Sequence, residues 1–204
     1  EAIGTVMTKL RDLKLEENTL LFVISDNGGA SKEAEQMGLR GSKWFVWEGG
    51  IRVTWMAQWK GTIPGNRVVN DPVIQLDVLP TSLAAAGAEK LPVELDGVNL
   101  LPLLKGETDK LAPRELYFRF GVQHAVRQGD WKLVKASKHM EPMLVNLATD
   151  PGEQRDLSAE NPAKKAELTA LFDKWNASMQ SPRWEDQRWN GEPDRKADKK
   201  KKKK

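Results

Sequence analysis

The chain has 204 residues, of which 39% are hydrophobic and 30% are charged, as expected for a globular protein. Its net charge of +3 comes from the terminal lysines Lys199–Lys204, so the remainder is mildly acidic and no nucleic-acid partner is expected. No apolar run approaches the roughly 20 residues of a membrane span, and Glu1 leads directly into helical sequence without a targeting signal. The sequence contains no cysteine, which excludes disulfides, zinc–thiolate sites and a cysteine nucleophile from these residues.

Helix and strand patterns alternate in the first half of the chain. Ala2–Leu13 carries apolar residues at helical spacing, and Thr19–Ser25 is a short apolar run typical of a strand buried on both faces. A helix followed by such a strand suggests a parallel sheet with covered faces. Ile51–Trp59 alternates with a period of two and predicts another strand, and Asp77–Ala86 predicts a helix. Leu95–Leu104 is an apolar segment that we expect to pack back on the body.

The second half predicts a smaller unit of strands closed by one helix. The strand patterns are Leu116–Phe120, Gln123–Gln128, Trp131–Lys135 and Met143–Leu147. Gly129-Asp130 is typical of a tight hairpin between the second and third of these strands. Pro162–Met179 predicts an amphipathic helix. Its expected buried stripe is Ala166, Leu168, Leu171, Phe172 and Trp175.

A polar cluster follows the first buried strand. Asp26-Asn27-Gly28-Gly29 ends that strand, and ligands gather at the carboxyl ends of strands in open α/β sheets. Asp26 and Asn27 offer one charged and one neutral oxygen ligand, as calcium or magnesium prefers. The alternative is a simple turn, because Asx residues with glycine are common after strands.

Lys43 stands at the end of the long polar loop Gly28–Lys43, a length that usually indicates function. It could bring an ammonium group to the same place, although most lysines are solvated surface residues. We expect Glu48 and Arg52 to form a structural ion pair or to bind loop backbone. Trp44 and Trp47 flank the loop and are the tryptophans that best suit a substrate contact.

Six motifs occur in order along the chain: SDNGG, LRGSKWFVWEGGIRV, QLDVLPTSLAAAG, LDGVNLLPLL, AVRQGDWKLV and NLATDPGEQRDL. Together they resemble the C-terminal portion of the sulfatase family, the arylsulfatase-like branch of the alkaline phosphatase superfamily. The resemblance implies an α/β fold, with the C-terminal part of an alkaline phosphatase-like sulfatase core at residues 1–112. A small four-stranded antiparallel sheet with a C-terminal helix would follow at 113–180. Composition predicts a polar, lysine-rich, disordered tail at 181–204.

The resemblance also implies roles for particular residues. Asp26 and Asn27 would ligate one calcium ion, whose shell is completed by residues absent from this chain, and Lys43 would contact the sulfate as a catalytic and substrate-binding residue. His124 could reach a sugar from the small subdomain, although a histidine satisfied within its own strand is the more common case. The substrate would be an aryl or carbohydrate sulfate, either a sulfated small molecule or a sulfated glycan. The resemblance further implies a periplasmic or secreted protein.

The nucleophile implied by the resemblance is missing from these residues. Sulfatases use a formylglycine made in a C/S-x-P-x-R or S-x-A-x-R motif, and Ser181-Pro182-Arg183 has the wrong spacing. We therefore expect a C-terminal fragment that is inactive alone. Two alternatives stay open: a phosphoester hydrolase of the same superfamily, against which Asn27 argues, and a non-catalytic binding or assembly piece.

Overall fold

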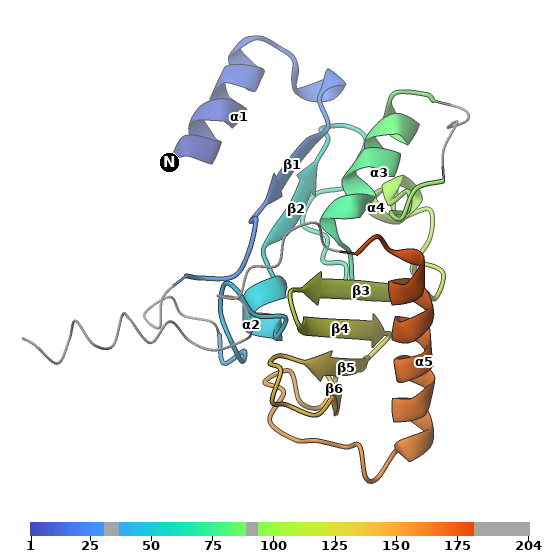
Figure 1. Ribbon diagram of the computed structural model, residues 1–204. Coiled ribbons are helices and arrows are strands. Elements are labelled where there is room, and N and C mark those ends of the chain that lie inside the picture. The colour runs from blue at the N-terminus through green and yellow to red at the C-terminus, as the bar shows by residue number, and fades with distance from the viewer. Residues whose placement is uncertain (31–36, 89–93, 182–204) are drawn as a thin grey trace, which may run out of the picture. The chain divides into compact units, whose positions relative to one another are not determined.

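The computed structural model describes residues 1–30, 37–88 and 94–181 (Figure 1). The chain divides into two compact units that interleave along the sequence. Unit 1 consists of Glu1–Ser25 and Thr54–Ala112, and unit 2 consists of Asp26–Val53 and the chain from Pro113 onward. The segment Asp26–Val53 therefore clusters with the C-terminal sheet. The domain boundaries 1–112 and 113–180 stay a prediction, and nearly all of 181–204 lies outside the described residues.

Unit 1 contains a two-stranded sheet with helices before and after it. Its elements are α1 (Ala2–Asp12), η1 (Glu16–Asn18), β1 (Leu21–Ile24), β2 (Trp55–Gln58), η2 (Gln75–Asp77), α3 (Val78–Ala85) and α4 (Leu101–Lys105). β1 and β2 pair antiparallel, with Leu21 opposite Gln58 and Ile24 opposite Trp55. The parallel pairing suggested by the sequence is thus wrong for these two strands, because a preceding helix does not decide which segment pairs with a strand.

The strand expected over Ile51–Trp59 is shorter than predicted. Glu48–Ile51 forms a helical turn, α2, and only Trp55–Gln58 is extended and paired. The burial of β2 alternates as the period of two predicts, with Trp55 and Ala57 half-buried between exposed neighbours. The expected burial of β1 on both faces is not observed, because its four residues are all partly exposed.

Asp77 organises the helical part of unit 1. Its buried carboxylate accepts hydrogen bonds from the backbone N–H of Ile74 and of Val98, each at 2.9 Å. Thr81 Oγ1 donates to the Asp77 carbonyl at 2.6 Å and accepts from the N–H of Leu100 at 2.9 Å. These bonds hold the segment before α4 against α3. The apolar segment Leu95–Leu104 therefore packs back on unit 1 as expected, and its end forms α4.

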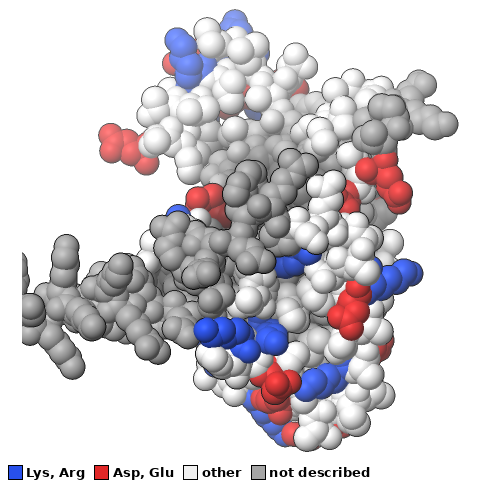
Figure 2. Space-filling view, in the orientation of Figure 1, with Lys and Arg blue, Asp and Glu red and all other residues white. Residues whose placement is uncertain are grey.

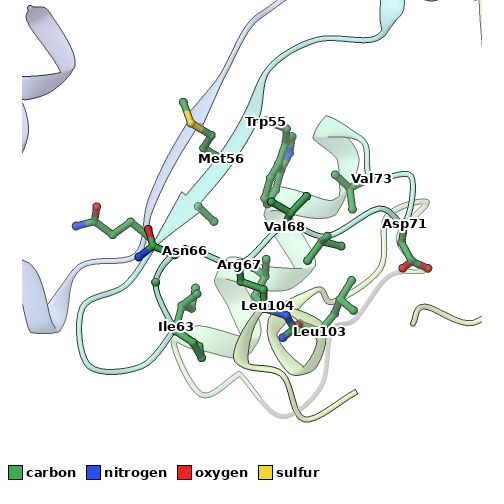
Figure 3. A pocket seen from close by; sticks show the side chains of 15 residues that line it. Trp55, Met56, Ile63, Asn66, Arg67, Val68, Asp71, Val73, Leu103 and Leu104 are labelled. Carbon is green, nitrogen blue, oxygen red and sulfur yellow. The ribbon is translucent and has the colours of Figure 1, made fainter. Parts of the chain in front are cut away.

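Unit 1 also carries a hollow beside β2 (Figure 3). Trp55, Val68, Val73 and Leu104 contribute apolar lining. Its two charged side chains are engaged with backbone: Arg67 donates to the carbonyl of Leu103 at 2.7 Å, and Asp71 accepts from an N–H at 3.1 Å. This hollow therefore offers apolar surface more than reactive groups.

Unit 2 is built on a four-stranded antiparallel sheet in the order β3-β4-β5-β6. The elements are α2, β3 (Glu115–Phe120), β4 (Gln123–Gln128), β5 (Trp131–Lys135), β6 (Met143–Asn146) and α5 (Pro162–Ser178). All four strands and the helix agree with the sequence prediction to within one residue at either end. On the face drawn in Figure 2, positive and negative side chains are interspersed over this sheet and helix.

The two faces of this sheet are covered by different segments. α5 covers one face, where Leu168 and Phe172 are buried against Val126, Leu133 and Leu144 (Figure 1). Leu171 and Trp175 pack at the edge of this cluster, whereas Ala166 is exposed and does not belong to the buried stripe that the sequence predicted.

The opposite face is covered by a loop from far earlier in the sequence. Val46 and Trp47 are buried there against Ala125, Val134 and Val145. The segment that carries Lys43 is therefore part of the hydrophobic core of the C-terminal sheet.

Candidate functional site

The turn Asp26–Gly29 lies tightly against a second glycine turn. Asp26 is exposed, and Asn27 is half-buried with its Nδ2 donating to the Gly28 carbonyl at 2.9 Å. A Cβ atom on Gly28 would stand 1.8 Å from the carbonyl oxygen of Gly49. Only glycine allows this approach of two backbones, so the close packing explains one glycine of the SDNGG motif.

Backbone hydrogen bonds join this turn to the loop that carries Lys43. The N–H of Lys43 donates to the Gly29 carbonyl at 2.9 Å, and the N–H of Gly28 donates to the Gly50 carbonyl at 2.9 Å. Within the loop, the N–H of Gly49 donates to the Arg40 carbonyl at 2.7 Å. These bonds place the backbone of Lys43 beside the turn Asp26–Gly29, and a shared site for its ammonium group stays a prediction. Its Nζ lies 5.0 Å from the centroid of the Trp44 ring.

A buried ionic cluster anchors the loop to the sheet. Lys132 Nζ lies 2.8 Å from Glu48 Oε1 and 2.8 Å from Glu153 Oε1, and the lysine is 0% exposed. Glu153 Oε2 also accepts the N–H of Glu48 at 2.6 Å. Arg127 of β4 approaches Glu48 at 3.9 Å. Each carboxylate therefore has a cationic partner, as buried charges require.

The expected pairing of Glu48 with Arg52 is wrong, because Glu48 pairs with Lys132 and Arg127. The sequence contains a signal for this. In the strand Trp131–Lys135, Lys132 has the same parity as Val134 and so falls on an inward face. A lysine at an inward position needs a buried carboxylate, and sequence alone does not say which one.

Glu153 is held in a left-handed backbone conformation, with φ of +54°. Burial raises the pKa of its carboxyl group, and the ammonium of Lys132 opposes that shift. Its carbonyl accepts a hydrogen bond from Arg40 at 2.8 Å. A strained backbone conformation persists only where surrounding contacts hold it in place. Glu153 is held by Arg40 and by the N–H of Glu48, both in the loop that carries Lys43.

Polar and aromatic contacts complete the attachment of the loop. Gln123, 1% exposed, donates from Nε2 to the Trp44 carbonyl at 2.9 Å, and its Oε1 lies 3.4 Å from the Val46 nitrogen. The guanidinium of Arg40 lies 3.9 Å from the centroid of the Trp47 ring, and Trp47 is only 5% exposed. Trp47 is therefore a core residue, unlike its neighbour Trp44.

His124 lies on the other face of the sheet. Its ring stacks on Phe172 of α5, with centroids 4.1 Å apart and planes inclined by 13°. Burial lowers the pKa of this imidazole, and Lys135 lowers it further, while Asp173 acts in the opposite direction. Because the Lys43 loop covers the opposite face, this placement favours a locally satisfied histidine, and we do not propose a substrate contact for it.

The donors for a metal ion are two oxygen-bearing side chains in adjacent positions. Among the described residues, no group of three or more His, Cys, Asp or Glu side chains could hold a metal ion. The exposed carboxylate of Asp26 and the amide of Asn27 suit a hard cation and supply part of the six to eight oxygens that calcium takes. Calcium would therefore need further ligands.

The segment that carries Lys43 is bonded through its backbone to the turn that carries Asp26 and Asn27, so one packed unit holds a cationic side chain and oxygen donors for a hard cation, a set of groups suited to an anionic ester. A family model described as Sulfatase matches residues 1–88. Steryl-sulfatase of Mus musculus is 30% identical over 214 residues, covering 84% of this chain and 34% of that protein. Arylsulfatase A of Homo sapiens is 36% identical over 190 residues, covering 76% of this chain and 36% of that protein.

Solved structures agree with these relatives. The crystal structure of Ps i-CgsB in complex with k-i-k-neocarrahexaose matches with a TM-score of 0.78 and 30% identity, covering 91% of this chain and 43% of that chain. The chain belongs to the sulfatase family. It spans about a third of the length of the curated relatives named above. The predicted fold class, an α/β sulfatase fold with a four-stranded antiparallel sheet and a C-terminal helix, is confirmed.

The described part of the chain contains no helix that is both long enough and apolar enough to cross a bilayer.

Proposed function

We propose that this chain is the C-terminal part of a calcium-dependent sulfatase that hydrolyses aryl or carbohydrate sulfate esters. The observation that carries the proposal is the packing of the Lys43 loop against the Asp26–Gly29 turn, with the N–H of Lys43 bonded to Gly29. The two packed segments carry Lys43, the proposed cation for the sulfate, and Asp26 and Asn27, the proposed oxygen ligands for a metal, in a chain of this family. A structural neighbour at 30% identity was solved with a neocarrahexaose, which supports a sulfated glycan as substrate.

Lys43 would act on the charge that develops during hydrolysis. A sulfate ester carries one negative charge, and charge builds on the bridging oxygen as its bond to sulfur breaks. A fixed ammonium near that oxygen stabilises the transition state more than the ground state. The buried cluster of Glu48, Lys132 and Glu153 would keep the loop from moving during this step.

Asp26 and Asn27 would hold calcium together with ligands from the rest of the enzyme. When bound, the ion supplies positive charge next to the sulfate. The formylglycine nucleophile would also come from outside these 204 residues, since neither form of its motif occurs in them. The complete enzyme would be periplasmic or secreted, by analogy with the family.

The test is Lys43→Ala in the complete enzyme that carries this chain. Removing one preorganised charge donor costs on the order of a hundred- to a thousandfold in turnover, so we expect that loss in kcat on an aryl sulfate. Lys43→Arg should restore little, because a planar fork does not replace a compact ammonium. Lys174→Ala, an exposed lysine of α5, is the matched control and should leave kcat unchanged.

Two outcomes would contradict the proposal. Turnover of Lys43→Ala near the normal value, with an unchanged melting temperature, would make Lys43 an ordinary surface residue. Faster hydrolysis of an aryl phosphate than of the matching aryl sulfate would favour a phosphoester hydrolase of the same superfamily.

A further inference from the structure

Trp44 has a backbone conformation that bulky residues rarely adopt. Its φ is +79°, and the N–H of Phe45 donates to the Ser42 carbonyl at 3.1 Å to close a turn around Lys43 and Trp44. A positive φ at the third residue of such a turn is typical of type II, where glycine normally stands. A tryptophan there is strained, and strain of this kind gathers at functional sites.

The sheet of unit 2 supports the strained residue. Gln123 of β4 donates to the Trp44 carbonyl at 2.9 Å from a fully buried position. Phe120 of β3 stacks on the indole, with ring centroids 6.1 Å apart and planes inclined by 29°. Trp44 as a residue is nevertheless 49% exposed, so part of a large apolar side chain remains open to solvent beside Lys43.

The position of this indole relative to Lys43 indicates what could contact it. Lys43 Nζ lies 5.0 Å from the ring centroid, so a sulfate held by the ammonium has its alcohol part within reach of the indole. Pyranose rings carry C–H groups that pack on aromatic surface, while their hydroxyl groups stay in water, which suits a half-exposed indole. Trp47, three residues on, is buried in the core and is not available for this contact.

We propose that Trp44 is a specificity-determining residue that contacts the sugar ring of a carbohydrate sulfate ester. This inference rests on the proposed function, and it assigns the substrate class to sugar sulfates rather than aryl sulfates. The strain at Trp44 is retained because the side chain is needed at that position for binding.

The test uses Trp44→Gly, Trp44→Ala and Trp44→Phe in the complete enzyme. The substrate is the fastest of a panel of monosulfated pyranoses, and inorganic sulfate serves as a competitive inhibitor. In Trp44→Gly and Trp44→Ala we expect KM for the sugar sulfate to rise about tenfold, as the loss of one stacking contact implies, with kcat within about twofold. The Ki of inorganic sulfate should not change, because sulfate alone does not reach the indole, and Trp44→Phe should restore most of KM.

A melting temperature separates binding from a merely structural role. Trp44→Gly should melt higher than Trp44→Ala, because glycine adopts φ of +79° without strain and alanine does not. Val122→Ala, a partly exposed residue next to β4, is the control and should change neither KM nor Ki.

A normal KM for the sugar sulfate in Trp44→Gly would overturn this inference while leaving the proposed function intact. Turnover of aryl sulfates with no turnover of any sugar sulfate would also overturn it. An enzyme that hydrolyses no sulfate ester would overturn the proposed function, and this inference with it.

Discussion

Lys132 places its ammonium group 2.8 Å from the carboxylate of Glu48, and this contact joins strand β5 to the loop that carries Lys43. Glu153 approaches the same ammonium at 2.8 Å from the segment after β6. All three side chains are buried. The C-terminal sheet is thereby a support for the site loop, connected to it by charge as well as by the apolar contacts of Val46 and Trp47.

Removing Lys132 should destabilise unit 2 strongly. Lys132→Met leaves two buried carboxylates without their shared partner, and breaking a buried pair in this way costs about 3–5 kcal/mol. We expect this loss in the free energy of unfolding measured by denaturant titration. Lys132→Met combined with Glu153→Gln should recover part of it, because one uncompensated charge is removed. An exposed control, Lys174→Met, should lie within about 0.5 kcal/mol of the parent.

Gly28→Ala should disturb the site loop. A Cβ atom at this position would stand 1.8 Å from the Gly49 carbonyl oxygen, so the two turns must separate. We expect faster hydrogen exchange at the N–H groups of Gly28 and Lys43, which bond across these turns. Gly4→Ala is the matched control, because nothing lies within 4 Å of a Cβ there and alanine favours a helix interior. Unchanged exchange in Gly28→Ala would contradict the close packing.

Asp26→Ala should lower calcium occupancy in the complete enzyme sharply. Asp26 supplies the charged oxygen of the pair, and calcium affinity depends on the number of charged ligands. Metal content measured by mass spectrometry checks this, with Asp109→Ala, an exposed aspartate, as control. The present chain alone should bind calcium weakly in calorimetry, because two side chains are a small part of the shell. Full occupancy in Asp26→Ala would remove Asp26 from the metal site.

His124 should make the stability of the chain depend on pH below neutrality. Burial lowers its folded-state pKa below the ordinary 6.5, so between those values the unfolded state binds more protons. Stability contributed by the neutral imidazole is therefore present above pH 6.5 and is lost as pH falls through the folded-state pKa. The melting temperature should fall between pH 7.5 and 5.5, and His124→Phe should show a smaller fall.

The local patterns of the sequence determined most of unit 2. The short strand-like runs Gln123–Gln128 and Trp131–Lys135, joined at Gly129-Asp130, and the helical spacing of Pro162–Met179 predicted elements that the structure contains almost unchanged. The strands β4, β5 and β6 are buried on both faces, so short apolar runs between turn residues marked them, whereas α5 buries one face and its helical spacing repeats with the backbone. The ordered motifs likewise indicated the family, and the resemblance implied roles for Asp26, Asn27 and Lys43.

The tertiary structure decided which segments meet. Periodicity identifies a strand and does not identify its partner, so the antiparallel pairing of β1 with β2 could not be derived from the sequence. The same limit applies to Glu48 and Lys132, which are separated by 84 positions and meet only when Val46 and Trp47 pack on the sheet. The positive φ of Trp44 also depends on tertiary contacts, because Gln123 and Phe120 hold a conformation that the local sequence disfavours.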